Sequence, residues 1–505
     1  MTQLGSVARL HAGRALSRLA QGFGTFTGQT STRQWMIAGA IGVALGITTL
    51  AVMAFPSRWA PLIVLAVLCP FVAMIVGVRR LLLAIIVLDI PLQLDTNLGY
   101  REDVASLGAL GGLNISLTTV SLIILYALWL AGALARREPQ PRIRFRDSLP
   151  LAFYLAFVAL SIAAARDVTL SLYQFALLLQ MFLLYVYVAS TVQTRRDVLF
   201  LVTLLLVSLV LESLIMIASQ SLGPGFQIPG IKIRLDAGDG IAQQSYRVGG
   251  TVGSPNTAAG FLSLLLMPAL GLLLTWFERR HKLLGLLAFG LAIVALTLTF
   301  SRGGWTAFVL SLVILCVLAW FRGWLAPRIL LAVILAAVLV STLFSDAVSA
   351  RLFGEDSGSA RSRIPLMNLA YRVIGDQPVL GVGANNYAIR IKDYATPEFN
   401  GEWLYSVHNK YLLIWAETGI GALLTFIWFL AVTVRRGWRS VRSGERYLSP
   451  LALGLTAAII GHVSQMFVEA FNGRPLMQLL WLMAGLVTAM SYIGNDQAKR
   501  VGRAG

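Results

Sequence analysis

Charged residues are scarce in this chain, and their scarcity excludes an ordinary soluble enzyme. Only 13% of the 505 residues are Asp, Glu, Lys or Arg, whereas 57% are hydrophobic and the mean hydropathy is +0.75. A bilayer core of about 30 Å requires roughly 20 apolar residues per helix. The sequence therefore predicts an all-α, polytopic bundle of about 12–14 transmembrane helices. The fourteen candidate spans are 34–54, 59–77, 79–94, 115–135, 149–165, 170–191, 197–221, 255–277, 282–300, 303–321, 326–345, 409–434, 449–470 and 474–493.

Cysteine and the common cofactor motifs are also rare. Cys69 and Cys316 both fall in predicted spans, so no disulfide framework or cysteine metal site is available. No DxD on an outer segment, no HExxH and no His, Cys and carboxylate cluster occurs, so we predict neither a metal site nor a cofactor. The sequence has no Walker A motif, which argues against ATP-driven transport. The net charge of +18 is interpreted as topology and affinity for anionic lipid, not as nucleic-acid binding.

Basic residues are distributed unevenly between the two sides of the predicted spans. With a cytoplasmic N-terminus, 26 of the 41 Lys and Arg residues lie inside and 15 outside, ten of the latter in two long loops. This positive-inside pattern predicts that both termini are cytoplasmic. The predicted organisation begins with a cytoplasmic amphipathic segment (1–33) and a membrane bundle (34–345) that includes an outer loop at 222–253. A large outer loop carrying short helices (346–408), the last transmembrane helices (409–493) and a cytoplasmic tail (494–505) follow.

Three arginines on predicted outer segments are candidates for binding an anion. Arg247 lies in a glycine-rich stretch directly before a helix, where backbone N–H groups and the helix N-terminus favour negative charge. Arg302 lies on a short turn at a depth where a charge is costly unless it is paired or lines a cavity. Arg363 belongs to a predicted amphipathic surface helix over 361–372. The alternative readings are a tight turn with an interfacial arginine, a snorkelling side chain and a solvated basic helix.

The chain has only four histidines, and one of them lies beside these arginines. His11 and His281 fall on the cytoplasmic side, and His462 lies inside a predicted span as a packed histidine. His408 ends the long outer loop where it meets the apolar run at 409–434. An imidazole can accept a proton at neutral pH, so His408 is the candidate general base.

Four stretches in this order resemble the O-antigen ligase and O-antigen polymerase superfamily of bacterial inner-membrane glycosyltransferases. They are YRVGGTVGSPNTAAGFL, TLTFSRGGWTAFVL, ARSRIPLMNLA followed by IGDQPVLGVGANNYA, and VHNKYLLIWAETGIGALL. The resemblance implies a GT-C-like transferase that faces the periplasm. It would take a glycan from undecaprenyl diphosphate and pass it to a sugar hydroxyl, which in the ligase belongs to lipid A-core. No nucleotide is required, because the lipid diphosphate carries the energy.

The resemblance also assigns roles to individual residues. His408 matches the base proposed for the family, and Arg247 and Arg302 match the arginines proposed to hold the donor diphosphate. Arg363 is kept as a third phosphate contact, and the supporting residues are Asn256, Asn409 and Tyr411. Fixed guanidinium groups would stabilise the leaving diphosphate without a metal, and a single displacement would invert the anomeric configuration.

The close VHNKYL and SRGGW matches favour the ligase. Three other functions compete with it. The polymerase differs mainly in its acceptor, which is a second lipid-linked repeat. A protein O-oligosaccharyltransferase usually has a longer soluble extension after its last span. A glycolipid flippase or exporter would also use arginines for a diphosphate, but it would need neither His408 nor an acceptor site.

Overall fold

The computed structural model of the protein describes most of the predicted bundle. The described residues are 77–134, 145–237, 246–325, 363–395 and 405–501, with Cys69 and Val72, and side chains are described as far as residue 494. The predicted segment 1–33, the predicted spans 34–54 and 326–345 and most of 59–77 lie outside these residues. The chain divides into two compact units, Met1–Leu81 and Leu82–Gly505. All that follows concerns the second unit.

The prediction of an all-α membrane protein with many spans is confirmed. Within the described ranges, nine helices are long and apolar enough to cross a membrane, and the strands form only two small sheets. The helices of these nine spans are α6 (Leu117–Leu134), α7 (Leu149–Ser161), α8 (Val168–Thr191), α9 (Arg195–Leu222), α10 (Pro255–Leu273), α11 (Arg279–Leu298), α12 (Arg302–Phe321), α17 (Lys410–Arg442) and α19 (Arg474–Val501). Two shorter helices, α4 (Val78–Leu92) and α18 (Ser449–Gln465), accompany them.

The burial of the helices separates the centre of the bundle from its rim. In α10 and α19, 83% and 94% of the apolar window is buried, compared with 22% in α6. Small residues bring α10 and α18 together, since a Cβ at Gly271 would lie 2.9 Å from the Pro450 carbonyl oxygen. Close backbone approach of this kind is how helices pack when lipid offers the same apolar surroundings as protein. The side chains that α10 and α19 carry are therefore held in a rigid core.

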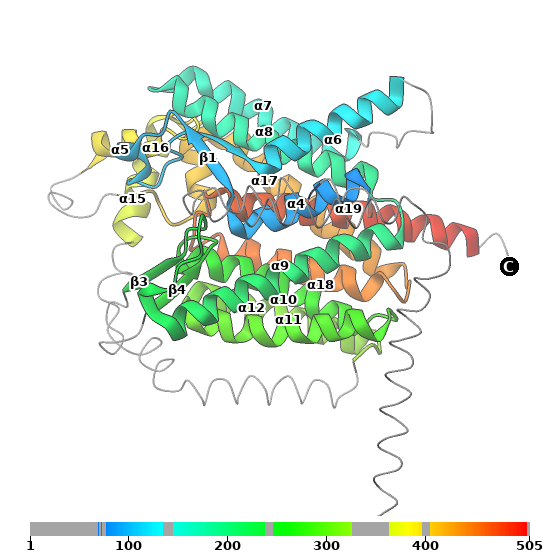
Figure 1. The fold of residues 1–505 in the computed structure, drawn as a ribbon. Coiled ribbons are helices and arrows are strands. Elements are labelled where there is room, and N and C mark those ends of the chain that lie inside the picture. The colour runs from blue at the N-terminus through cyan, green and yellow to red at the C-terminus, as the bar shows by residue number, and fades with distance from the viewer. Residues whose placement is uncertain are drawn as a thin grey trace, which may run out of the picture. The chain divides into compact units, whose positions relative to one another are not determined.

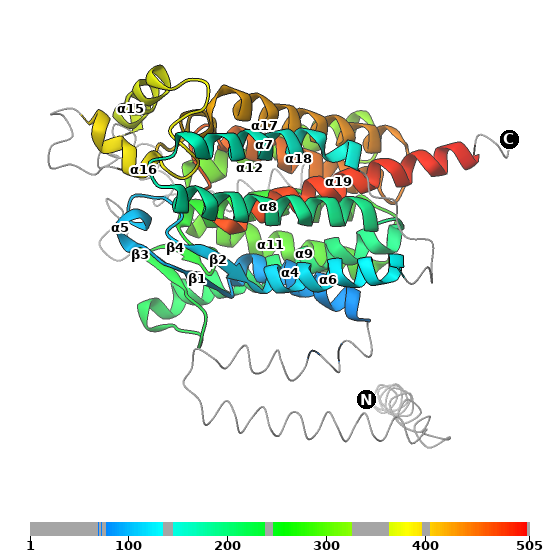
Figure 2. The same cartoon turned by 90° about the horizontal axis from the view of Figure 1, so that it is seen from above.

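The short elements gather at one end of the helices, on the left in Figures 1 and 2. They are the hairpin of β1 (Asp95–Leu98) and β2 (Leu113–Ser116), the hairpin of β3 (Arg234–Ala237) and β4 (Tyr246–Gly250), and the helices α5 (Glu102–Ala105), α15 (Arg363–Asp376) and α16 (Tyr387–Arg390). The expected surface helix at 361–372 is present as α15. The glycine-rich stretch at Arg247 is not a loop throughout, because Arg247 lies on β4 opposite Asp236.

Two predicted spans differ from the helices that form. The span 79–94 corresponds to α4, which has 15 residues and contains Pro91. The span 449–470 corresponds to α18, which already ends at Gln465. The apolar run continues to Val468, so hydropathy alone could not locate this end. The correction moves Glu469 out of the helix and into the loop before α19.

Helix α17 is broken near its start. Gly419 has a φ of 79°, and a Cβ there would overlap the carbonyl group of Val379. The chain of the long loop inserts at this point: Val382 N donates to Ala416 O at 2.9 Å, and Ile420 N donates to Pro378 O at 3.0 Å. The loop thereby supplies partners for backbone groups that the break leaves open.

Candidate functional site

Four predicted site residues lie at the beginnings of four different helices. Asn256 is in the first turn of α10, Arg302 is the first residue of α12, Arg363 is the first residue of α15, and His408 lies two residues before α17. Helix N-termini carry partial positive charge and exposed N–H groups, so each is a favourable place for an anion. These four residues are far apart in the sequence, and each lies at a helix end that attracts negative charge.

Local sequence explains why these helices begin where they do. Ser254 accepts from Thr257 N at 3.2 Å and Pro255 occupies the first position of α10. Ser301 accepts from Gly304 N at 3.3 Å at the start of α12. Asn409 accepts from the backbone of Tyr411 and Leu412 at the start of α17. Side-chain caps of this type stabilise a helix start by about 1 kcal/mol. They also fix the residues beside them.

Glu469 joins three of these segments. Its Oε1 accepts from Asn256 Nδ2 at 2.7 Å and from an Nη of Arg363 at 3.1 Å. Its Oε2 lies 3.4 Å from His408 Nδ1. The side chains of Glu469 and His408 are 10% and 19% exposed, so the pair is largely shielded from water. We call Glu469, His408, Arg363, Asn256 and Arg247 the Glu469 cluster, since Arg247 joins it through Asn256.

Arg247 connects the cluster to the start of α12. Its Nε donates to the Thr299 carbonyl at 3.2 Å, and an Nη donates to Asn256 Oδ1 at 3.0 Å. The first turn of α12 also packs on the residues before Glu469, because a Cβ at Gly303 would lie 3.2 Å from a methyl group of Val468. The Arg302 backbone therefore lies next to the segments that carry Arg247 and Glu469.

His408 is held from two sides. Its ring stacks on Tyr405, with 5.6 Å between the ring centroids and 20° between the planes. Its Nδ1 faces the Glu469 carboxylate, with 3.4 Å between Nδ1 and Oε2. Burial raises the pKa of the Tyr405 phenol, so this ring is neutral at physiological pH. A carboxylate on Nδ1 orients an imidazole and stabilises its protonated form.

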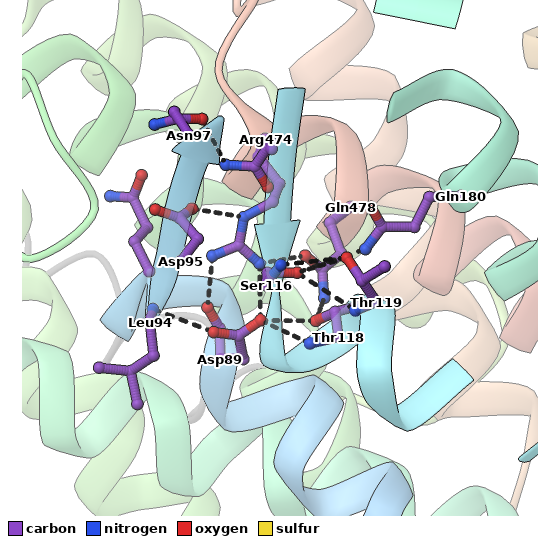
Figure 3. Close-up of polar contacts among 12 residues, drawn as sticks. Asp89, Leu94, Asp95, Asn97, Ser116, Thr118, Thr119, Gln180, Arg474 and Gln478 are labelled. Atoms are coloured by element: carbon purple, nitrogen blue, oxygen red, sulfur yellow. Dashed lines mark hydrogen bonds and ion pairs between the residues drawn. The ribbon is translucent and has the colours of Figure 1, made fainter. Parts of the chain in front are cut away.

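The loop that carries Glu469 is anchored at both ends. At its start, Lys410 N donates to Met466 O at 2.9 Å. At its end, Arg474 is 4% exposed and donates to Asp89 at 2.7 Å and to Asp95 at 3.1 Å. Figure 3 shows Arg474 lying between these two carboxylates. An ion pair this well buried and hydrogen-bonded is costly to break, so the loop has a fixed end.

Backbone strain occurs at two positions in this region. Phe300 and Phe471 have φ values of 49° and 45°, which bulky side chains rarely adopt. Each lies two residues from a cluster segment, Phe300 before Arg302 and Phe471 after Glu469. Strain of about 1–3 kcal/mol per residue persists only where the surroundings impose it, and such residues gather at functional sites.

Two of the predicted supporting residues make structural contacts instead of joining the cluster. The side-chain oxygen of Asn409 caps α17, as described above. The hydroxyl of Tyr411 donates to the Val463 carbonyl at 2.8 Å, and its ring packs on Phe467. The other five predicted residues lie in or beside the cluster. In the part of the chain that the structure describes, no group of three His, Cys, Asp or Glu side chains is close enough to hold a metal ion.

Glu469 is the residue that the sequence did not single out. The sequence places it inside the predicted span 449–470, next to the apolar residues Phe467, Val468 and Ala470. The available signal was its position at the outer end of the span 449–470, on the side where His408 was predicted.

A comparison with known families matches a region that contains two members of this cluster, Arg363 and His408. The sequence model described as O-antigen ligase matches residues 287–427, from within α11 to within α17. This chain carries an O-antigen ligase family domain. The resemblance inferred from the four stretches is thereby confirmed. The domain includes Arg302, Arg363 and His408, whereas Arg247, Asn256 and Glu469 lie outside the matched residues. No curated protein matches the chain.

The match identifies a domain family but not a reaction. It covers 141 of the 505 residues, and the described part of the chain has nine helices of spanning length. The residues around the domain complete the cluster, since β4 supplies Arg247 and the loop before α19 supplies Glu469.

Proposed function

We propose that this protein is an O-antigen ligase of the bacterial inner membrane. It transfers O-antigen polysaccharide from undecaprenyl diphosphate to a sugar hydroxyl of lipid A-core on the periplasmic side. The observation that supports this proposal most directly is the Glu469–His408 pair, which lies among arginines near converging helix N-termini. A transferase needs these two elements together: a base for the acceptor hydroxyl and fixed positive charge for the leaving group.

In the proposed reaction, Arg247 and Arg302 bind the donor diphosphate, with Arg363 as a third contact. The acceptor oxygen attacks the anomeric carbon from the face opposite the diphosphate while His408 Nε2 takes the hydroxyl proton. The anomeric C–O bond breaks, its electron pair remains on the diphosphate, and the configuration inverts. Guanidinium groups suit this role because their fork matches two phosphate oxygens at once.

Glu469 would act on His408 and not on the substrate. With Nδ1–H directed at Oε2, the carboxylate holds the tautomer that presents Nε2 as a base and stabilises the imidazolium that forms. Asn256 and Arg363 occupy Oε1 and so fix the carboxylate itself. Asn256 is accordingly assigned to positioning.

The test is transfer of glycan from undecaprenyl diphosphate to rough lipopolysaccharide by the purified protein, with His408→Ala as the variant. Product from the wild type, and none from a variant that remains folded, supports both the ligase reaction and the base. Chain growth on lipid-linked repeats, without transfer to lipopolysaccharide, would instead identify a polymerase. If His408→Ala still moves lipid across the membrane and neither product forms, the protein is an exporter.

A further inference from the structure

An open cleft of about 600 Å³ lies beside the Glu469 cluster and shares no residue with it. Its lining comes from the loop after β1, the start of α8, and α16 with the segment that follows it; the residues are Arg101, Arg166, Asp167, Val168, Ile389, Lys392 and Asp393. This volume is in the range of small-molecule binding sites, roughly 300–1,000 Å³. It gives room for part of an oligosaccharide.

The cleft has a preorganised set of charges. Arg101 is paired with Asp167 and with Asp103, the latter at 3.1 Å, and Arg166 is paired with Asp393 at 3.3 Å. The two guanidinium groups nevertheless remain 41% and 59% exposed. Because a guanidinium has five N–H donors, each keeps donors for a ligand while its carboxylate partner holds it in place.

Lys392 adds a third cation to this lining. It is exposed and makes no ion pair with any residue that the structure describes. The lining carries three positive and two negative side chains. Asp103 pairs with Arg101 and Arg390 pairs with Asp393 at 3.3 Å, so the set with its partners holds four positive and three negative charges. Mixed acidic and basic groups of this kind can hold sugar hydroxyls, and the excess of positive charge selects a sugar that bears a phosphate or carboxylate.

The wall of the cleft is bonded to the segment that carries His408. Ser406 donates through its N and its Oγ to the Leu107 carbonyl at 3.1 and 3.0 Å. The ring of Tyr405, which stacks on His408, lies against Gly108. The loop from Arg101 to Leu110 therefore contributes Arg101 to the cleft. Through Leu107 and Gly108 the same loop contacts the segment that carries His408.

A pair of asparagines fixes the other walls to the same loop. Asn385 exchanges two 2.8 Å hydrogen bonds with the backbone of Leu110. Asn386 accepts from Asp167 N at 2.8 Å and donates to Asp167 O at 3.0 Å. Both asparagines are buried. Hydrogen bonds of buried side chains therefore fix the walls of the cleft, which is not a gap between loose loops.

We propose that this cleft binds a phosphate- or carboxylate-bearing sugar of a substrate glycan and aligns that glycan with His408. The proposal rests on the transferase function proposed above. The anionic sugar belongs either to the acceptor oligosaccharide or to the donor polysaccharide, and the kinetics separate these two sources.

The experiment uses Arg166→Glu and Lys392→Glu in the full-length protein. Both side chains are exposed and lie outside the Glu469 cluster. Lys232→Glu is the matched control, since Lys232 is also exposed, lies on the predicted outer loop 222–253 and does not line the cleft. Transfer is measured while each substrate is varied in turn at a saturating level of the other.

The expected result is a rise in KM of about tenfold or more for one substrate, with kcat within about twofold, as lost charge-assisted contacts predict. A rise for the acceptor assigns the sugar to the acceptor, and a rise for the donor assigns it to the donor. Chemical dephosphorylation or carboxyl reduction of that substrate should remove the difference between variant and wild type. Unchanged KM values for both substrates in both variants would overturn the proposal.

A binding measurement separates this proposal from the proposed function. Deacylated lipid A-core oligosaccharide and the donor glycan released from its polyprenyl diphosphate are each titrated calorimetrically into wild type, Arg166→Glu and the Lys232→Glu control, without the second substrate. Binding that is lost only in Arg166→Glu supports the cleft even if no transfer occurs. Normal transfer together with equal binding of both probes by all three proteins rejects the cleft and leaves the proposed function standing.

Discussion

At the scale of single residues, the site depends on one carboxylate with several partners. Glu469 contacts His408, Arg363 and Asn256 from a loop only eight residues long, between α18 and α19. Its negative charge offsets part of the positive charge collected at the helix N-termini. A neutral residue at this position would leave His408 without the group that faces its Nδ1.

Glu469→Gln should lower kcat by about 10²-fold with a smaller change in KM, because an amide keeps the shape but cannot stabilise an imidazolium. The measurement is the steady-state transfer assay on protein shown to be folded by its unfolding temperature. Glu278→Gln, at a side chain that is 70% exposed before α11, is the matched control. A kcat equal to that of the wild type would remove Glu469 from the mechanism.

Arg247→Lys and Arg302→Lys should each lower kcat/KM by about tenfold to a hundredfold. Lysine retains the charge but not the fork that binds two phosphate oxygens, and in Arg247 it also loses one of the bonds to Thr299 and Asn256. Arg234→Lys on β3 serves as the control, since that side chain is 61% exposed. Near-normal activity in both variants would mean that these arginines only anchor the fold.

At the scale of elements, the beginnings of α10, α12, α15 and α17 meet around a loop, whereas the helices themselves serve as supports. The broken helix α17 is the most constrained of these supports. Its break at Gly419 accommodates the backbone of the long loop, so the position of His408 depends on the fit between the helix and that loop.

Gly419→Ala should destabilise the protein by about 3 kcal/mol, because the residue has positive φ and its Cβ would overlap the Val379 carbonyl. The matched control is Gly290→Ala in α11, where a Cβ meets nothing within 4 Å. That control should be stabilising by about 0.5–1 kcal/mol or neutral. Thermal unfolding in detergent compares the two variants, and equal unfolding temperatures would contradict the account of the break.

At the scale of the whole molecule, the sequence predicts the spans well and the site in part. Apolar runs locate helices because a bilayer demands length and hydrophobicity, and neither depends on tertiary contacts. The end of α18 and the strand β4 were missed, since both are set by packing and pairing between distant segments. His408, Arg247 and Arg302 were predicted from their residue type and position, and their roles stay predictions. Glu469 emerged only when its three partners were seen together.

The predicted orientation can be tested on a variant in which Cys69 and Cys316 are replaced by alanine. A cysteine at Tyr371, which is 52% exposed on α15, should react with a membrane-impermeant maleimide from the periplasmic side. A cysteine at Glu278, whose side chain is 70% exposed before α11, should react only after permeabilisation. The reverse pattern would invert the topology and exclude a periplasmic site.

Transfer activity should survive EDTA, since the proposed mechanism assigns the charge of the leaving diphosphate to guanidinium groups. The assay compares untreated enzyme, chelated enzyme and chelated enzyme supplied with Mg²⁺. Activity that is lost with EDTA and restored by Mg²⁺ would show that a cation shares this task.

The anchoring of the Glu469 loop has a thermodynamic consequence for turnover. With Met466 bonded to Lys410 at one end and Arg474 buried against Asp89 at the other, the loop has few conformations available before any substrate arrives. The loop loses its conformational entropy once, when the protein folds, and this loss does not recur in each catalytic cycle. In the proposed reaction, substrate binding then needs no large rearrangement of this loop, because the geometry around His408 is set when the protein folds.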